Sequence, residues 1–271
     1  MHRQVNAISG RLSLRPPQRD SLEILDRVIE IAQPHKNGDI AQALTVINSE
    51  YATVTDFERE FPSLCFALAT GVGKTRLMGA FIAYLRLAHG LRNFFVLAPN
   101  LTIYNKLITD FTANTPKYVF RGIAEFATTP PVIVTGDNYE SGLGAKTSLF
   151  DGYGEEVTIN IFNISKINSE VRGGRSPRIK RLSEYIGDSY FNYLAELPDL
   201  VLLMDESHRY RASAGARAIN ELKPVLGLEL TATPFVETSR GPVPFKNVIY
   251  DYPLGKALRD GFVKEPAVVT Q

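Results

Sequence analysis

A short apolar run that leads directly into a glycine-rich turn constrains this chain more than any other feature. Residues 64–69 read LCFALA, and after the turn a helical pattern begins at Lys74. Glycines let backbone N–H groups converge on phosphate oxygens, and the helix N-terminus adds its positive dipole end. Lys74 would reach the β- and γ-phosphates, and the Thr75 hydroxyl would coordinate Mg²⁺. The predicted nucleotide-binding residues are Thr70, Gly71, Val72, Gly73, Lys74 and Thr75, although Leu68 replaces the first glycine of the general pattern.

Strand-like and helical patterns alternate along the chain. Short apolar runs occupy 64–69, 94–98, 131–135, 157–162, 200–204 and 226–231. Helical spacing of apolar residues is found at 21–33, 39–50, 74–89, 101–112, 178–197 and 212–223. Nearly continuous apolar strands separated by helices are typical of a parallel sheet that is covered on both faces. The expected fold class is therefore α/β, with a mainly parallel sheet and helices on both faces.

Two more polar signatures follow predicted strands. Asp205-Glu206-Ser207-His208 comes directly after the run 200–204, at the strand end where ligands bind in such sheets. Asp205 would hold the Mg²⁺ hydration shell, and Glu206 would polarise the water that attacks the γ-phosphate. The alternative interpretation is an exposed acidic pair that caps the next helix. His208 is grouped with Lys74, Asp205 and Glu206 as a candidate catalytic residue.

The third signature is Thr231-Ala232-Thr233-Pro234, which follows the run 226–231. Two hydroxyls and a proline at a strand end are also ordinary turn chemistry. However, three polar signatures in this order, each at the end of a strand of one sheet, favour a shared nucleotide site.

Composition excludes several classes of protein. The single cysteine, Cys65, rules out an internal disulfide framework and fits a reducing, cytoplasmic setting. With only four histidines and that cysteine, the composition argues against a zinc site. No apolar run approaches the roughly 20 residues of a membrane span, and the N-terminus lacks the apolar core of a signal peptide. A net charge of +1 means that any binding of nucleic acid must use a local patch.

The three signatures together resemble motifs I, II and III of the superfamily 2 helicases and translocases of DEAD/DEAH type. The version LATGVGKT is most similar to the Res subunits of type III restriction enzymes. The resemblance covers about residues 11–265. It implies a RecA-like P-loop ATPase domain that uses ATP and Mg²⁺, with Thr231 and Thr233 coupling hydrolysis to movement.

The resemblance extends to looser motifs. Leu14-Arg15-Pro16-Pro17-Gln18 is similar to the glutamine motif, in which Gln18 would hydrogen-bond the adenine edge. Leu97-Ala98-Pro99-Asn100 and Phe162-Asn163-Ile164 resemble motifs Ia and Ib, which line the nucleic-acid track in the family. The basic segment 166–181 follows and includes Arg172, Arg175 and Arg178. Nucleic acid, with DNA favoured, is therefore the expected partner of Pro99, Asn100, Asn163 and these arginines. The alternatives for the segment are a merely solvated loop and a loop that docks on the second RecA-like domain.

Three regions are expected. Residues 1–60 form an N-terminal helical segment with the glutamine motif, 61–240 the first RecA-like domain, and 241–271 a crossover towards a second RecA-like domain. In the family that second domain supplies arginine fingers, so we expect this chain on its own to hydrolyse ATP weakly. The resemblance also implies a methyltransferase or specificity subunit as a further partner.

Three function classes remain open. The first is the motor domain of an ATP-dependent DNA translocase or helicase of a type III-like restriction endonuclease. The second is an RNA helicase of the DExD/H type, and the third is a nucleotide-dependent switch without hydrolysis. A metal-nuclease pattern, Pro198-Asp199 with Glu221-Leu222-Lys223, is rejected, because its groups fall on a strand start and a helix end and cannot share one metal.

Overall fold

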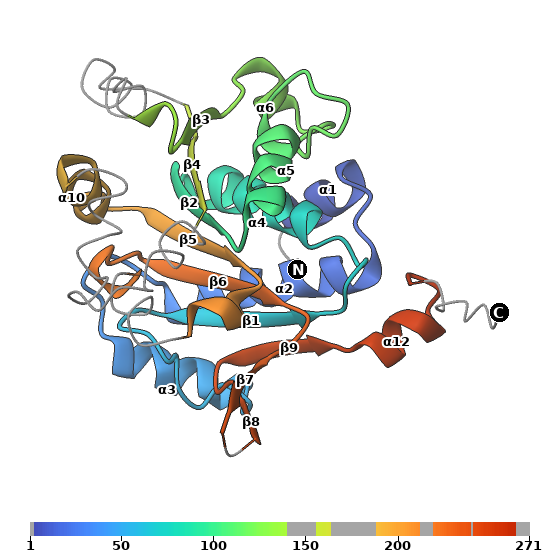
Figure 1. Ribbon diagram of the computed structural model, residues 1–271, viewed down its shortest axis with the longest axis vertical. Coiled ribbons are helices and arrows are strands. Elements are labelled where there is room, and N and C mark those ends of the chain that lie inside the picture. The colour runs from blue at the N-terminus through green and yellow to red at the C-terminus, as the bar shows by residue number, and fades with distance from the viewer. Residues whose placement is uncertain (1–2, 140–155, 164–187, 212–218, 240, 264–271) are drawn as a thin grey trace.

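A parallel sheet of seven strands forms the centre of the protein (Figure 1). The computed structural model describes residues 3–139, 156–163, 188–211, 219–239 and 241–263. In spatial order the strands are β3 (Val132–Thr135), β4 (Thr158–Asn163), β2 (Asn93–Ala98), β5 (Leu200–Asp205), β6 (Leu226–Thr231), β1 (Ser63–Leu68) and β9 (Val248–Tyr252). All six neighbouring pairs are parallel. The expected α/β class is confirmed.

Alternate residues of the central strands pack into two separate cores. On β2, Phe94 and Val96 join one hydrophobic cluster, whereas Phe95 and Leu97 join the other. The first cluster is shared with α4 (Lys74–His89) and α5 (Leu101–Phe111). The second is shared with α10 (Asp188–Glu196). Because side chains alternate between the two faces of a strand, a continuous apolar run indicates that both faces are buried.

The N-terminal helices cover α4 rather than forming a separate unit. Both α1 (Arg3–Arg11) and α2 (Pro16–Ala32) contact α4, and α3 (Ile40–Glu50) packs on α2. Helix α4 therefore lies between the sheet and the α1–α2 layer, which explains why residues 77–85 are buried throughout. Helix α1 was not predicted from the polar start of the chain, although Val5, Ile8 and Leu12 are buried at helical spacing.

The segment after Thr231 returns to the sheet. A hairpin of β7 (Phe235–Thr238) and β8 (Gly241–Pro244) leads into β9, which pairs with β1, and α12 (Leu254–Arg259) follows. Residues 241–271 were expected to leave the domain, and the pairing of β9 corrects that expectation for 248–252. Pro242 and Pro244 lie in β8 of the hairpin and Pro253 follows β9, so these prolines interrupt no central ladder.

The other predicted elements are found within one or two residues where the structure describes them, except that the helix expected at 21–33 begins five residues earlier, at Pro16. The helix expected at 178–197 is described only as α10, and of 212–223 only 219–221 are described as helical. The structure also describes a short helix, α6 (Ala124–Thr128), and the 3-10 turn η2 (Ser207–Tyr210). Within the described ranges, the protein contains no helix that is long and apolar enough to span a membrane.

Candidate functional site

The three polar signatures meet at the C-terminal ends of adjacent strands. They follow β1, β5 and β6, which are neighbours in the order β5-β6-β1. Ala67 pairs with Thr231 and Asp205 pairs with Leu230, so the ends of the three strands are level with one another. The sheet thus brings together residues that are more than 100 positions apart in sequence.

The glycine-rich turn takes the backbone form that phosphate-binding loops require. Gly71 has φ +86° and Gly73 has φ +100°, a region that side chains disfavour. Gly73 is the N-cap of α4, so the first N–H groups of the helix face the end of the turn. A Cβ atom on Gly73 would come within 2.6 Å of Gln18 Nε2. The second glycine is therefore required by both conformation and space.

Gln18 holds this turn from the side. Its Nε2 donates hydrogen bonds to the carbonyl oxygens of Val72 (3.0 Å) and Gly73 (2.9 Å), while its Oε1 accepts one from the Arg15 backbone N–H (2.8 Å). Arg15 donates from Nη1 to the Gly71 carbonyl oxygen at 2.8 Å. Both amide hydrogens of Gln18 are thus used by the turn, which leaves one Oε1 lone pair for another donor.

Lys74 and Glu206 form the central ion pair of the site. Lys74 Nζ lies 2.9 Å from Glu206 Oε1, and both side chains are mostly buried. Glu206 itself adopts the left-handed backbone conformation (φ 50°, ψ 54°), which is uncommon for a residue with a side chain. Such conformations concentrate at functional sites, where the surrounding structure maintains them.

Asp205 is the most perturbed acid of the site. It is only 6% exposed, and its Oδ1 accepts a hydrogen bond from the Glu206 backbone N–H at 3.1 Å. Burial raises the pKa of Asp205 to about 6, with Lys74 opposing the shift and Glu206 adding to it. A divalent cation beside this carboxylate would favour its charged form.

Oxygen donors here fit a magnesium ion that is shared with phosphates. Asp205 supplies a carboxylate and Thr75 a hydroxyl, the hard ligands that Mg²⁺ prefers. In the parts of the chain that the structure describes, no cluster of three or more His, Cys, Asp or Glu side chains could hold a metal by itself. Mg²⁺ commonly uses one or two protein ligands together with water and substrate phosphates, which matches this donor set.

His208 connects the second signature to the third. Its Nδ1 lies 3.0 Å from Thr231 Oγ1 and 3.1 Å from Thr233 Oγ1. Thr231 Oγ1 in turn lies 3.4 Å from Glu206 Oε2. Burial lowers the pKa of His208, partly offset by Glu206. These contacts form a polar chain from the Glu206 carboxylate to the loop after β6.

The residues expected to contact nucleic acid are described only in part. Ala98 and Asn163 are paired at the adjacent ends of β2 and β4, so the two loops begin side by side. Asn100 caps α5, with its Oδ1 accepting from the Ile103 backbone N–H at 2.9 Å. Pro99 and Asn163 are buried. Arg172, Arg175 and Arg178 lie outside the described residues.

Sequence reasoning missed Lys106, which donates a hydrogen bond to Thr75 Oγ1 at 2.9 Å. Its position four residues before Asp110 on α5 was the only available signal, because such pairs share a helix face.

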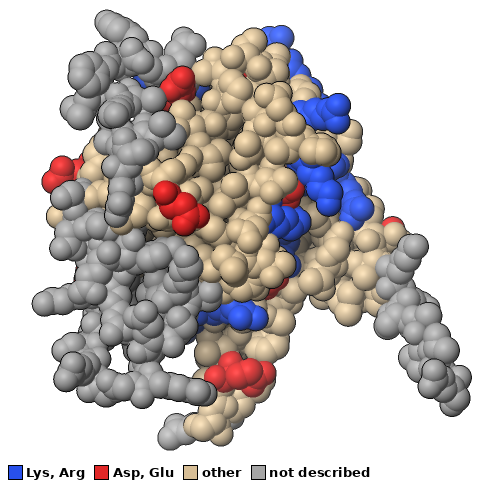
Figure 2. All heavy atoms as spheres, turned by 45° about the horizontal axis from the view of Figure 1, so that its top comes forward, with Lys and Arg blue, Asp and Glu red and all other residues tan. Residues whose placement is uncertain are grey.

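Although the net charge of the chain is +1, Figure 2 shows Lys and Arg side chains gathered on one side of the visible face, whereas acidic side chains there are scattered.

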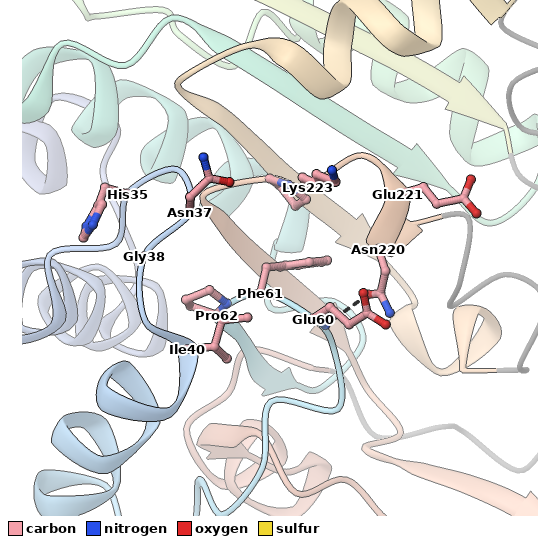
Figure 3. Close-up of a pocket in the computed structure, with 11 residues that line it drawn as sticks. His35, Asn37, Gly38, Ile40, Glu60, Phe61, Pro62, Asn220, Glu221 and Lys223 are labelled. Atoms are coloured by element: carbon pink, nitrogen blue, oxygen red, sulfur yellow. Dashed lines mark hydrogen bonds between the residues drawn. The ribbon is translucent and has the colours of Figure 1, made fainter.

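A separate pocket of about 430 Å³ lies at the other end of the strands (Figure 3). Phe61 and Pro62 line it just before β1, and Lys223 and Pro224 line it just before β6. The Glu60 backbone N–H donates to Asn220 Oδ1 at 3.2 Å across this pocket. Since ligands of parallel α/β sheets bind at the carboxyl ends, this pocket is not part of the nucleotide site.

Comparison with known proteins agrees with this architecture. The family model described as "Type III restriction enzyme, res subunit" matches residues 11–236. No curated protein sequence matches the chain. A nuclease-deletion mutant of the type ISP restriction-modification enzyme LlaGI, solved with a DNA substrate mimic, is similar with a TM-score of 0.54 and 13% identity.

That likeness covers 92% of this chain but only 18% of the LlaGI chain. The SWI2/SNF2 ATPase core of Sulfolobus solfataricus, solved with double-stranded DNA, gives a TM-score of 0.37 at 13% identity. It covers 73% of this chain and 33% of the other. The chain therefore spans a minor part of both proteins, and the fold it shares is that of RecA-like helicase domains.

Proposed function

Because this chain belongs to the family of type III restriction enzyme Res subunits, a family of helicase-type ATPase motors, we propose that it is the ATP-hydrolysing first motor domain of a DNA translocase or helicase in a type III-like restriction system. The observation that carries the proposal is the convergence of Lys74, Glu206 and Thr231 at adjacent strand ends. These side chains supply a cation, a carboxylate and a hydroxyl around the N-terminus of α4, where phosphates would bind.

Each side chain has a definite task in this proposal. Lys74 leaves Glu206 and binds the β- and γ-phosphates, which frees the Glu206 carboxylate to accept a proton from the attacking water. Asp205 and Thr75 would hold Mg²⁺, which when bound would supply positive charge beside the phosphates. His208, Thr231 and Thr233 transmit changes at Glu206 to the loop after β6. Gln18 keeps the turn in shape, and the remaining lone pair of its Oε1 would accept a hydrogen bond from the adenine of ATP.

DNA is proposed as the nucleic acid because LlaGI, which has a similar fold, was solved with a DNA substrate mimic. Pro99, Asn100 and Asn163 would line the track, since the loops after β2 and β4 start side by side. A second RecA-like domain and a methyltransferase or specificity subunit are proposed as partners. An RNA helicase remains the second candidate.

The test is the ATPase rate of the purified protein with duplex DNA, with single-stranded RNA and without nucleic acid. Stimulation by duplex DNA supports the proposal, and stimulation by RNA alone would instead select the RNA helicase. Lys74→Ala should abolish nucleotide binding and hydrolysis with the fold intact. Lys117→Ala is the matched control, because Lys117 is exposed in the loop after α5. Equal turnover in both variants would refute the assignment of Lys74.

A further inference from the structure

Lys106 reaches the metal-binding side of the site from a neighbouring helix. It lies on α5, and its Nζ donates to Thr75 Oγ1 at 2.9 Å and contacts Asp110 Oδ2 at 2.5 Å. Thr75 belongs to the first turn of α4, so this contact joins two helices that the sequence keeps 31 residues apart. None of the motif resemblances assigns a role to Lys106.

Asp110 fixes where the Lys106 ammonium lies. Asp110 is 5% exposed, and its Oδ1 has no hydrogen-bond partner among the described residues. A buried carboxylate of this kind needs a cation, and Lys106, one helical turn away, supplies it. The Lys106 side chain is 46% exposed, so its ammonium can leave Thr75 without crossing packed atoms.

The Lys106 contact uses the same atom that a magnesium ion would need. A threonine hydroxyl binds Mg²⁺ through a lone pair of Oγ1, and Lys106 donates its hydrogen to that oxygen. An ammonium and a magnesium ion cannot both lie close to one hydroxyl oxygen, because the repulsion between the two cations exceeds their attraction to that neutral oxygen. Binding of Mg²⁺ at Thr75 therefore requires Lys106 to move.

We propose that Lys106 competes with Mg²⁺ for the Thr75 hydroxyl. Lys106 occupies Thr75 Oγ1 until Mg²⁺ binds there together with a nucleotide. This inference rests on the proposed function. Asp110 keeps the displaced ammonium close by, so Lys106 returns when the metal leaves. Lys106 thus sets the Mg²⁺ concentration at which the site becomes complete.

The experiment measures metal affinity rather than hydrolysis. Mn²⁺ replaces Mg²⁺, and electron paramagnetic resonance detects free Mn²⁺ during a titration of the purified protein saturated with ADP. Lys106→Gln should tighten Mn²⁺ binding by about tenfold, the scale of one charge-assisted hydrogen bond. Lys117→Gln removes the same charge from an exposed neighbouring loop and should leave the affinity unchanged.

A double-mutant cycle separates competition for the oxygen from simple charge repulsion. In a Thr75→Val background the shared oxygen is gone, so Lys106→Gln should no longer tighten Mn²⁺ binding. If the same gain persists in that background, the competition does not use Thr75 and the inference is wrong. Unchanged Mn²⁺ affinity in Lys106→Gln alone would also overturn it.

ADP affinity in EDTA distinguishes the remaining outcomes. The inference expects Lys106→Gln to bind metal-free ADP like the wild type, and a large loss would make Lys106 a phosphate ligand instead. Failure of the proposed function would give a different result from failure of the Lys106 inference. In that case Lys74→Ala would bind ADP as well as the wild type, whatever Lys106 does to the metal.

Discussion

Two neighbouring acids in the site have different environments. Glu206 is partly exposed and paired with Lys74, whereas Asp205 is buried against the end of β5. Burial raises the pKa of Asp205 to about 6, whereas the Glu206 carboxylate lies 2.9 Å from Lys74 Nζ. Under the proposed function, Asp205 would hold the metal and Glu206 would act as the base, so the two acids can be tested separately.

Replacing Glu206 with Gln tests the role of the base. The amide keeps the shape but cannot take a proton, so ATP should still bind while hydrolysis falls by about 10²-fold or more. Rates from phosphate release and affinities from a fluorescent nucleotide would separate the two effects. Glu237→Gln, on the exposed strand β7, is the control. Hydrolysis at the wild-type rate would remove Glu206 from the mechanism.

Asp205→Asn should have opposite effects on stability and on metal binding. A carboxyl whose folded pKa is raised stabilises the fold only while it is protonated, so this contribution is lost as the pH rises from about 4 to 6. The neutral amide would avoid that cost and stabilise the protein at pH 7 by about 1–3 kcal/mol, with no gain near a pH of about 3.5. The same change should weaken Mg²⁺-dependent nucleotide binding. Urea unfolding at both pH values checks the sign, and a loss of stability at pH 7 would contradict it.

At the scale of elements, a buried charge network ties the segment after η2 to β6 and to the start of β9. Glu229 on β6 is fully buried; its Oε2 lies 2.6 Å from Arg211, and its Oε1 lies 3.4 Å from Arg59 Nε. Burial alone would raise the pKa of Glu229, but Arg59 and Arg211 hold it below its ordinary value. Asn247, just before β9, donates to the same carboxylate at 3.1 Å.

Glu229→Gln should be strongly destabilising, because it leaves the buried Arg59 guanidinium without its paired anion and leaves Arg211 with Glu58 as its remaining carboxylate partner. The expected loss is about 3–5 kcal/mol, as found when one partner of a buried ion pair is removed. Denaturant unfolding measures it, and Glu237→Gln on exposed β7 should change stability by less than about 0.5 kcal/mol. A similarly small effect at Glu229 would show that the network contributes little to the fold.

For the whole molecule, the order of the strands separates two regions of the same edge. The ends of β1, β5 and β6 carry the proposed nucleotide site, and those of β2 and β4 begin the loops of the proposed nucleic-acid track. Strands β2 and β5 are neighbours, so Asn100 follows the strand next to the one that ends at Asp205. Tyr210, in the turn η2 that follows β5, contacts β2 directly, since its hydroxyl donates to the Leu97 carbonyl oxygen at 3.2 Å.

Neutralising Arg172, Arg175 and Arg178 tests whether the basic segment belongs to this track. The segment carries an excess of five positive charges over 166–181, in a chain of net charge +1. If it binds phosphates, triple replacement by Gln should weaken binding about equally for all sequences and flatten its salt dependence. Fluorescence anisotropy at several salt concentrations provides the slope. An unchanged slope would exclude these arginines from the track.

Local patterns in the sequence were sufficient for the central strands β1 to β6, for the helices α2 to α5 and for the positions of the three signatures, but not for α1 or β9. Burial on both faces makes a parallel strand continuously apolar, and glycines are needed where the turn adopts positive φ, as at Gly71 and Gly73. Both effects depend on residues close in sequence. The polar signatures directly follow apolar runs in the sequence. Their positions therefore predicted which strand ends carry polar groups, although not which strands are neighbours in the sheet.

Only the tertiary structure decided which of these groups touch. The pairing of β1 with β9, the hold of Gln18 on Val72 and the reach of Lys106 to Thr75 join residues 31 to more than 180 positions apart. No local pattern encodes such contacts, because they depend on strand order and on how helices pack across the sheet. Helix α1 shows the same limit at smaller scale, because its packing on α4 explains why Val5 and Ile8, and Leu12 just after the helix, are buried.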